Sequence, residues 1–277
     1  MGTTLEVFFT GKFFRIPAYQ RDYVWDTGNV DDLFEDIIEA IETNTSHYIG
    51  TFILSKTSRP SVYNVVDGQQ RLTTLIMLFN MAIKELGTPN DRIIYGDRFI
   101  KSQNDGTWRL ELLNDNCAFF REMLEQYEKP KVQTKSQDLL WEAYDRIKTR
   151  VAALKSNQAV SKQLLEAIKR LEVMEFIESD DGKAIRMFQT VNDRGKPLSN
   201  VEKAKSLLIY YSNRFLGGSL DDYINKQFGK IFHNFTEAKT IGEQCSIEVI
   251  NQKRFSEDSV MRYHFLAFAG DLYDFDA

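Results

Sequence analysis

The sequence contains few of the residues that several specialised protein classes depend on. It has 2 cysteines, Cys117 and Cys245, together with 5 prolines and 15 glycines. Two cysteines cannot build a disulfide framework or a thiolate metal cluster, so we expect reduced thiols, which suit the cytoplasm. The low proline and glycine content excludes collagen-like and linker-like chains.

An excess of positive charge and long apolar runs are also missing. The 35 Lys and Arg residues are outnumbered by 40 Asp and Glu, which gives a formal net charge of −5. No overall basic field exists to hold nucleic acid, so any DNA contact needs a local patch or another part of a larger protein. No apolar stretch approaches the ~20 residues of a membrane span, and we find no signal peptide. We therefore expect a cytoplasmic protein with no membrane partner.

What the chain does contain is typical of a soluble globular protein. Of its 277 residues, 43% are hydrophobic and 13% aromatic, including 20 Phe and 12 Tyr. This composition predicts a large core and one large or two small domains. The last residues, Phe275-Asp276-Ala277, follow an apolar helix without an evident cap. We therefore expect a longer protein, with a natural terminus as the alternative.

Hydrophobic periodicity predicts an α+β fold in two parts. A small mixed-sheet domain at residues 1–90 precedes a mainly α-helical domain at 91–277. In the first part we expect an edge strand at 13–16, a helix at 30–41, hairpin strands at 48–55 and 62–66, and a helix that follows residue 71 and ends at Gly87. In the second we expect helices near 115–127, 136–156, 160–171, 183–191, 199–215, 219–234 and 256–270, a possible strand at 108–113, and either a strand or a helix end at 172–178.

The strongest local signal is a pentapeptide between a predicted strand and a predicted helix, Asp67-Gly68-Gln69-Gln70-Arg71. Gly68 permits a tight turn, and the first amides of the helix have no internal partners. These amides and the helix dipole form an anion site, to which Arg71 adds a fork suited to phosphate. Gln69, Gln70 and the hydroxyls of Thr73 and Thr74 add further donors.

Asp67 is of the type that holds a divalent cation or orients a water in phosphoryl transfer. In the alternative interpretation the pentapeptide is a capped turn, with Asp67 as the cap and Arg71 paired with an acid. The GxxxxGK[ST] pattern is absent, which excludes a P-loop.

Two further segments carry candidate ligand-binding side chains. In IPAYQRDYVW, residues 16–25, aromatic rings surround Arg21. Tyr19 can stack on a base, while Gln20 and Arg21 can donate to a phosphate or a base edge. In FQTVNDRGKPLS, residues 188–199, Asn192 and Arg194 belong to a small polar cluster between two predicted helices. The alternatives are an aromatic corner for the first segment and a solvated helix–turn–helix corner for the second.

Together these segments resemble the N-terminal DGQQR-motif domain of GmrSD-type (type IV) restriction proteins and of the related phosphorothioation-sensing defence protein. The patterns IPxYQRxYxW, VVDGQQRLTTL and FxxxNDRGKPLS occur in order between residues 16 and 199, and Tyr48-Ile49-Gly50-Thr51 fits as well. The first 90 residues are also similar to the ParB/sulfiredoxin fold, in which two comparable loops hold a nucleotide.

The resemblance implies an NTP-binding and NTP-hydrolysing regulatory domain in modification-dependent DNA restriction and phage defence. The implied partners are a nucleoside triphosphate, modified DNA and a C-terminal or separate HNH-like nuclease domain, and the implied cofactor is Mg²⁺. The chain has no HNH-type His/Asn/His cluster, so we expect it to lack nuclease activity. The alternatives are a non-hydrolysing nucleotide-gated or DNA-binding sensor module and a helical domain with a vestigial site.

The resemblance also assigns residues to roles. The catalytic candidates are Asp67, Gln70 and Arg71, and Asp67 is also the candidate metal ligand. The candidate nucleotide-binding residues are Gly68, Gln69, Gln70, Arg71, Thr74, Tyr19, Gln20, Arg21, Asn192 and Arg194.

Overall fold

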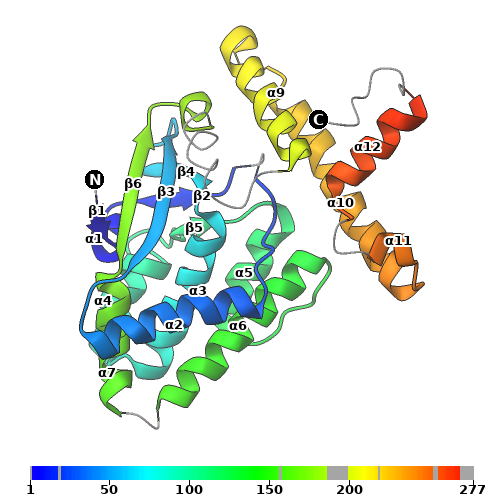
Figure 1. Ribbon diagram of the computed structural model, residues 1–277. Helices are drawn as coiled ribbons and strands as arrows, with labels where there is room; N and C mark the ends of the chain where they lie inside the picture. Colours follow the sequence, from blue (N-terminus) through cyan, green and yellow to red (C-terminus); the bar gives the residue numbers. More distant parts are fainter. Residues whose placement is uncertain are drawn as a thin grey trace. The chain divides into compact units, whose positions relative to one another are not determined.

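The computed structural model divides the chain into two compact units, Met1–Ala184 and Ile185–Ala277. It describes residues 2–17, 20–155, 158–185, 199–217, 219–251 and 255–268. The first unit combines a sheet with helices, and the described part of the second is helical (Figure 1). The predicted α+β class is confirmed.

The first unit is built on one six-stranded mixed sheet with the strand order β1-β6-β3-β4-β2-β5. The strands are β1 (Gly2–Thr4), β2 (Phe13–Arg15), β3 (Tyr48–Lys56), β4 (Val62–Asp67), β5 (Leu110–Glu111) and β6 (Glu172–Glu178). Strands β3 and β4 pair antiparallel, as the predicted hairpin requires. The predicted edge position of β2 is wrong, because this strand lies between β4 and β5 and pairs in parallel with both.

Helix α3 (Gln69–Leu86) runs through the middle of the first unit and is buried on most of its surface. The other elements of this unit are α1 (Leu5–Phe9), α2 (Thr27–Thr43), α4 (Pro89–Tyr95), a short π-helix at Gly96–Ile100, α5 (Asn114–Gln126), α6 (Lys135–Leu154) and α7 (Gln158–Arg170). Phenylalanine rings of α1 contact both the sheet and α3: the ring centroid of Phe8 lies 4.7 Å from that of Phe52 on β3, and the ring centroid of Phe9 lies 6.0 Å from that of Phe79 on α3. Helix α1 therefore connects β3 to α3 through the core.

The predicted domain boundary at residue 90 falls inside the first unit, within α4. Residues 91–184 complete this unit because β6 pairs with both β1 and β3. Helices α6 and α7 also pack against α3. A helix as apolar as α3 needs partners around its whole circumference, and the first 90 residues do not supply them. The segment at 172–178, for which the sequence predicts either a strand or a helix end, is a strand.

The second unit contains α9 (Asn200–Leu216), α10 (Asp221–Gln244), α11 (Glu248–Asn251) and α12 (Glu257–Phe268). The carboxylate of Asp258 accepts the backbone N–H groups of Asn200 and Val201, so α12 caps the start of α9. Most of the helix predicted at 183–191 lies outside the described residues. None of the described helices combines the length and the apolar character needed to cross a membrane.

Candidate functional site

The turn between β4 and α3 has the predicted geometry. Gly68 adopts a φ of +89°, and a Cβ atom at this position would lie 2.5 Å from Cδ1 of Phe52. Only glycine satisfies both the positive φ and this close approach. Gly68 is also the N-cap of α3, which has no side-chain hydrogen bond to its first amides. The strand, turn and helix that the sequence predicts are therefore present.

Gln70, a catalytic candidate, uses its side-chain amide to hold the loop that contains Asp22 and Val24. Its Nε2 donates to the backbone oxygen of Asp22, and its Oε1 accepts from the backbone nitrogen of Val24, each at 2.9 Å. The side chain is 8% exposed. Both ends of the amide already have partners in the protein, so Gln70 acts here as a positioning residue.

Two more contacts attach the same loop to α3 and β4. Nε2 of Gln20 donates to the backbone oxygen of Val66 at 2.6 Å. The hydroxyls of Tyr23 and Thr74 lie 2.8 Å apart, and burial raises the pKa of the Tyr23 phenol. The predicted binding residues Gln20 and Thr74 therefore make contacts that fix the loop in place. Tyr19 lies outside the described residues.

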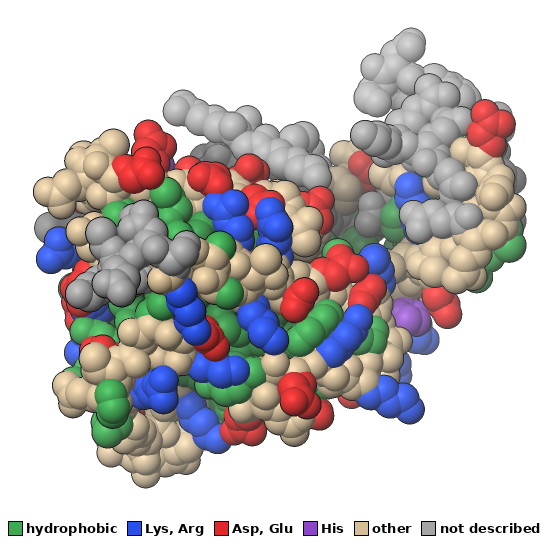
Figure 2. All heavy atoms as spheres, turned by 90° about the horizontal axis from the view of Figure 1, so that it is seen from below, with side chains coloured by type: hydrophobic (Ala, Val, Ile, Leu, Met, Phe, Trp, Pro, Cys, Tyr) green, Lys and Arg blue, Asp and Glu red, His purple; other side chains and the backbone are tan. Residues whose placement is uncertain are grey.

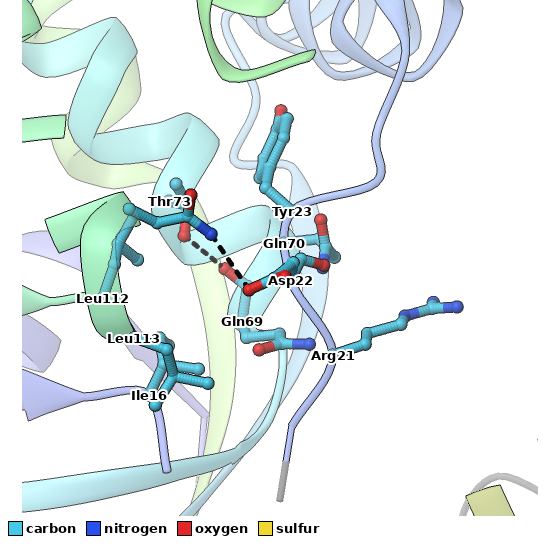
Figure 3. Close-up of a pocket in the computed structure, with 10 residues that line it drawn as sticks. Ile16, Arg21, Asp22, Tyr23, Gln69, Gln70, Thr73, Leu112 and Leu113 are labelled. Carbon is cyan, nitrogen blue, oxygen red and sulfur yellow. Dashed lines mark hydrogen bonds between the residues drawn. The ribbon is translucent and has the colours of Figure 1, made fainter. Parts of the chain in front are cut away.

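A small cavity of about 20 Å³ lies between this loop, α3 and the start of α5 (Figure 3). Ile16 and Leu112 contribute apolar walls, while Gln69 and Thr73 contribute polar ones. The cavity holds about one water molecule and is too small for a nucleotide. Arg21 lines the cavity, and its guanidinium extends away from it (Figure 3).

Arg71 extends from the same helix turn toward β3. Its Nη1 donates to the backbone oxygen of Thr51 at 3.2 Å, and its guanidinium lies 5.6 Å from the ring centroid of Phe52. A Cβ atom at Gly50 would lie 2.7 Å from Nη1, so the absence of a side chain at Gly50 makes room for the guanidinium. Burial lowers the pKa of Arg71, which nevertheless stays protonated. Arg71 does not line the cavity that Arg21 lines.

Asp67 ends β4 beside Arg71. Burial raises the pKa of its carboxyl, against the opposing effects of the Gly68 backbone N–H and the Arg71 charge. Among the described residues, no group of three His, Cys, Asp or Glu side chains is placed to hold a metal ion. Mg²⁺ is often held by one or two carboxylates and by the oxygens of a bound phosphate. Asp67 therefore fits a Mg²⁺ that is bound mainly by a nucleotide.

A polar cluster on the sheet was not foreseen from the sequence. Asp181 accepts hydrogen bonds from the hydroxyl of Ser55 and from Nδ2 of Asn64, the latter at 3.0 Å. Nε of Arg15 donates to Oδ1 of Asn64 at 3.0 Å and so orients the amide. Polar residues at positions 55 and 64 of two otherwise apolar strands are the signal that points to this cluster. It attaches the segment after β6 to the sheet.

The third motif cannot be compared with these contacts, because Asn192 and Arg194 lie outside the described residues. The binding roles predicted for them, for Tyr19 and for Arg21 stay predictions.

Comparison with known protein families agrees with the resemblance seen in the motifs. The family described as the GmrSD restriction endonuclease, N-terminal domain, matches residues 5–209. No curated protein matches the chain. The matched segment covers most of the 277 residues and contains all three motifs. The chain therefore belongs to the family of GmrSD restriction endonuclease N-terminal domains, which implies a part in a type IV restriction system.

Proposed function

We propose that this chain binds and hydrolyses a nucleoside triphosphate and thereby regulates modification-dependent DNA restriction. The observation that carries the proposal is the state of Arg71. Its Nη1 donates to Thr51, while Nε and Nη2 have no acceptor among the described residues. A partly buried guanidinium with unused donors suits an anionic ligand that accepts several hydrogen bonds, as a phosphate chain does.

The start of α3 supplies a second source of positive potential at the same turn. The helix has 18 residues, and no side chain caps its first amides. Arg71 belongs to the first turn of this helix, so its charge and the positive end of the helix dipole would attract an anion to the same region. Gly68 brings the backbone close without a side chain in the way.

Asp67 is the residue that supports turnover. A carboxylate whose pKa is raised by burial accepts a proton more readily near neutral pH. Asp67 would orient the attacking water, accept its proton, or contact a nucleotide-bound Mg²⁺. Such an ion would neutralise charge on the phosphates.

A second candidate function is a nucleotide-gated switch without turnover. The contacts of Gln70 favour it, because both ends of its side-chain amide are already hydrogen-bonded within the protein. Of the three catalytic candidates, Asp67 and Arg71 are then the two that can contact a ligand. The two functions share the same binding site and differ in phosphate release.

Modified DNA and an HNH-like nuclease domain are the proposed partners. On the face seen in Figure 2, basic and acidic side chains are intermixed, so this face offers little electrostatic support for direct DNA binding. In the first unit Arg146 pairs with Asp31 at 2.8 Å. A regulatory role in which another domain contacts the DNA is consistent with the net charge of −5.

The test combines equilibrium binding of each NTP with phosphate release, with and without Mg²⁺ and with plain, methylated, glucosylated and phosphorothioated DNA. We expect saturable binding and turnover, and no cutting of any DNA. Binding without turnover selects the switch, and absence of binding contradicts both functions. An Arg71→Met variant should lose affinity while keeping the wild-type melting temperature within a few degrees.

A further inference from the structure

Strand β3 contains an irregularity directly beside Arg71. Tyr48 pairs with Glu172 of β6, whereas Thr51 pairs with Met174, so β3 has one more residue than β6 over this stretch. Gly50 lies within it and has a φ of +116°. This is the geometry of a β-bulge, and bulges redirect side chains next to functional sites.

The bulge brings two hydroxyl groups together. In a regular strand, Tyr48 and Thr51 would point to opposite faces of the sheet. Here the hydroxyl of Tyr48 lies 2.8 Å from Oγ1 of Thr51. The side chain of Tyr48 is nevertheless 52% exposed, so the hydroxyl pair is open to solvent.

The hydroxyl pair and Arg71 share one location. The guanidinium packs against Gly50, which lies between the two hydroxyl residues in the chain. Its Nη1 donates to the backbone oxygen of Thr51 itself.

Counting hydrogens shows what kind of ligand these groups would take. Two hydroxyls carry two hydrogens, and the bond between them uses one. The other hydroxyl hydrogen has no acceptor among the described residues, and neither do Nε and Nη2 of Arg71. The three groups therefore present donors together, and the ligand that matches them accepts hydrogen bonds and carries negative charge.

We propose that the hydroxyls of Tyr48 and Thr51 bind, together with Arg71, one phosphate group of the nucleotide, so that the β3 bulge forms a wall of the phosphate site. This inference rests on the proposed function and adds to it two residues on β3. Because the proposed contact is to a phosphate group and not to the base or the ribose, it is the same for every NTP.

The test measures equilibrium binding of an NTP and of inorganic pyrophosphate to the wild type and to the Tyr48→Phe and Thr51→Val variants. Each variant should weaken the binding of both ligands by about tenfold, since each loses one hydrogen bond to a charged group. The matched control is Tyr63→Phe, which removes a phenol hydroxyl from the neighbouring strand β4 near the hairpin end. It should bind like the wild type, and melting temperatures should show that all variants fold.

The outcomes separate the two claims. If the wild type binds nucleotide, Arg71→Met loses it, and Tyr48→Phe and Thr51→Val bind like Tyr63→Phe, the inference about the bulge is overturned and the proposed function stands. If only NTP binding falls and pyrophosphate binding does not, the hydroxyls contact the nucleoside and the inference is also overturned. If the wild type binds neither ligand, the proposed function itself fails.

Discussion

The two sides of the first turn of α3 differ in how much of their hydrogen-bonding capacity the protein uses. On the side of the 20–24 loop, Gln70 and Thr74 are buried and fully engaged with the loop and with the helix backbone. On the side of β3, Arg71 has a single hydrogen-bond acceptor among the described residues, the backbone oxygen of Thr51. One short motif therefore contains both residues that hold the fold together and a residue left to bind a ligand.

Helix geometry explains the division. Successive residues of an α-helix point about 100° apart, so Gln70 and Arg71 cannot face the same element. Gln70 meets the loop, and Arg71 meets the strand. The comparison predicts that substitutions on the loop side change stability and that substitutions on the β3 side change ligand binding.

The largest loss of stability is expected at Gly68, because both the loop side and the β3 side of the turn depend on this residue. Gly68→Ala forces a side chain into a positive φ and against the ring of Phe52. We expect a loss of about 2–4 kcal/mol in the free energy of unfolding. Urea unfolding of the variant measures this, with Gly217→Ala as a control, because Gly217 also has a positive φ but no atom within 4 Å of its Cβ position. Equal losses in the two variants would show that contact with Phe52 contributes nothing.

Gln70→Ala tests the loop side alone. It removes the two hydrogen bonds that the Gln70 amide makes with the backbone of Asp22 and Val24, and we expect a loss of about 1–3 kcal/mol in the free energy of unfolding. Hydrogen exchange should accelerate at the Val24 amide in particular. Arg71→Met is the matched comparison, with a change of less than about 1 kcal/mol, since removal of a partly buried charge offsets the lost contact. If Arg71→Met lost more stability than Gln70→Ala, the difference between the two sides of the turn would be contradicted.

Ser55→Ala tests the cluster on the sheet, at a distance from the turn. The variant removes one of the donors to Asp181, while Asn64 still bonds to the carboxylate. We expect a loss of about 1 kcal/mol in the free energy of unfolding, measured by chemical denaturation. A loss above about 3 kcal/mol in the free energy of unfolding would mean that the Ser55 hydroxyl contributes more than one of several hydrogen bonds to the Asp181 carboxylate.

Asp67→Asn is expected to give the smallest change in the free energy of unfolding, and the informative result is the direction in which that change varies with pH. Because burial raises the pKa of Asp67 above its ordinary 3.8, the folded state holds this proton more tightly than the unfolded state. The contribution of Asp67 to stability is therefore fully present below pH 3.8 and is lost as pH rises through the folded-state pKa. Unfolding free energies across this range should fall for the wild type relative to Asp67→Asn. A constant difference would contradict the cause assigned to the shift.

Local signals in the sequence were enough to predict the turn at Gly68, the hairpin and the helix that follows. They could not predict the role of Gln70, because its partners Asp22 and Val24 lie 48 and 46 residues earlier in the chain. The extent of the first unit was missed for the same reason, since β6 joins the sheet from residues 172–178. The position of Asp181 depends on the pairing of β3 with the distant strand β6, and the positions of Tyr48 and Thr51 depend on the bulge in β3. Hydrophobic periodicity in the sequence predicts neither feature.

The central claim is that the start of α3 and Arg71 hold the phosphates of a nucleotide. Hydrogen exchange at the amides of Gln69, Gln70 and Arg71, with and without saturating NTP, tests it most directly. The account predicts that nucleotide slows exchange at these amides in the wild type and leaves it unchanged in Arg71→Met. Unchanged exchange at these amides in wild-type protein that binds the nucleotide would contradict it.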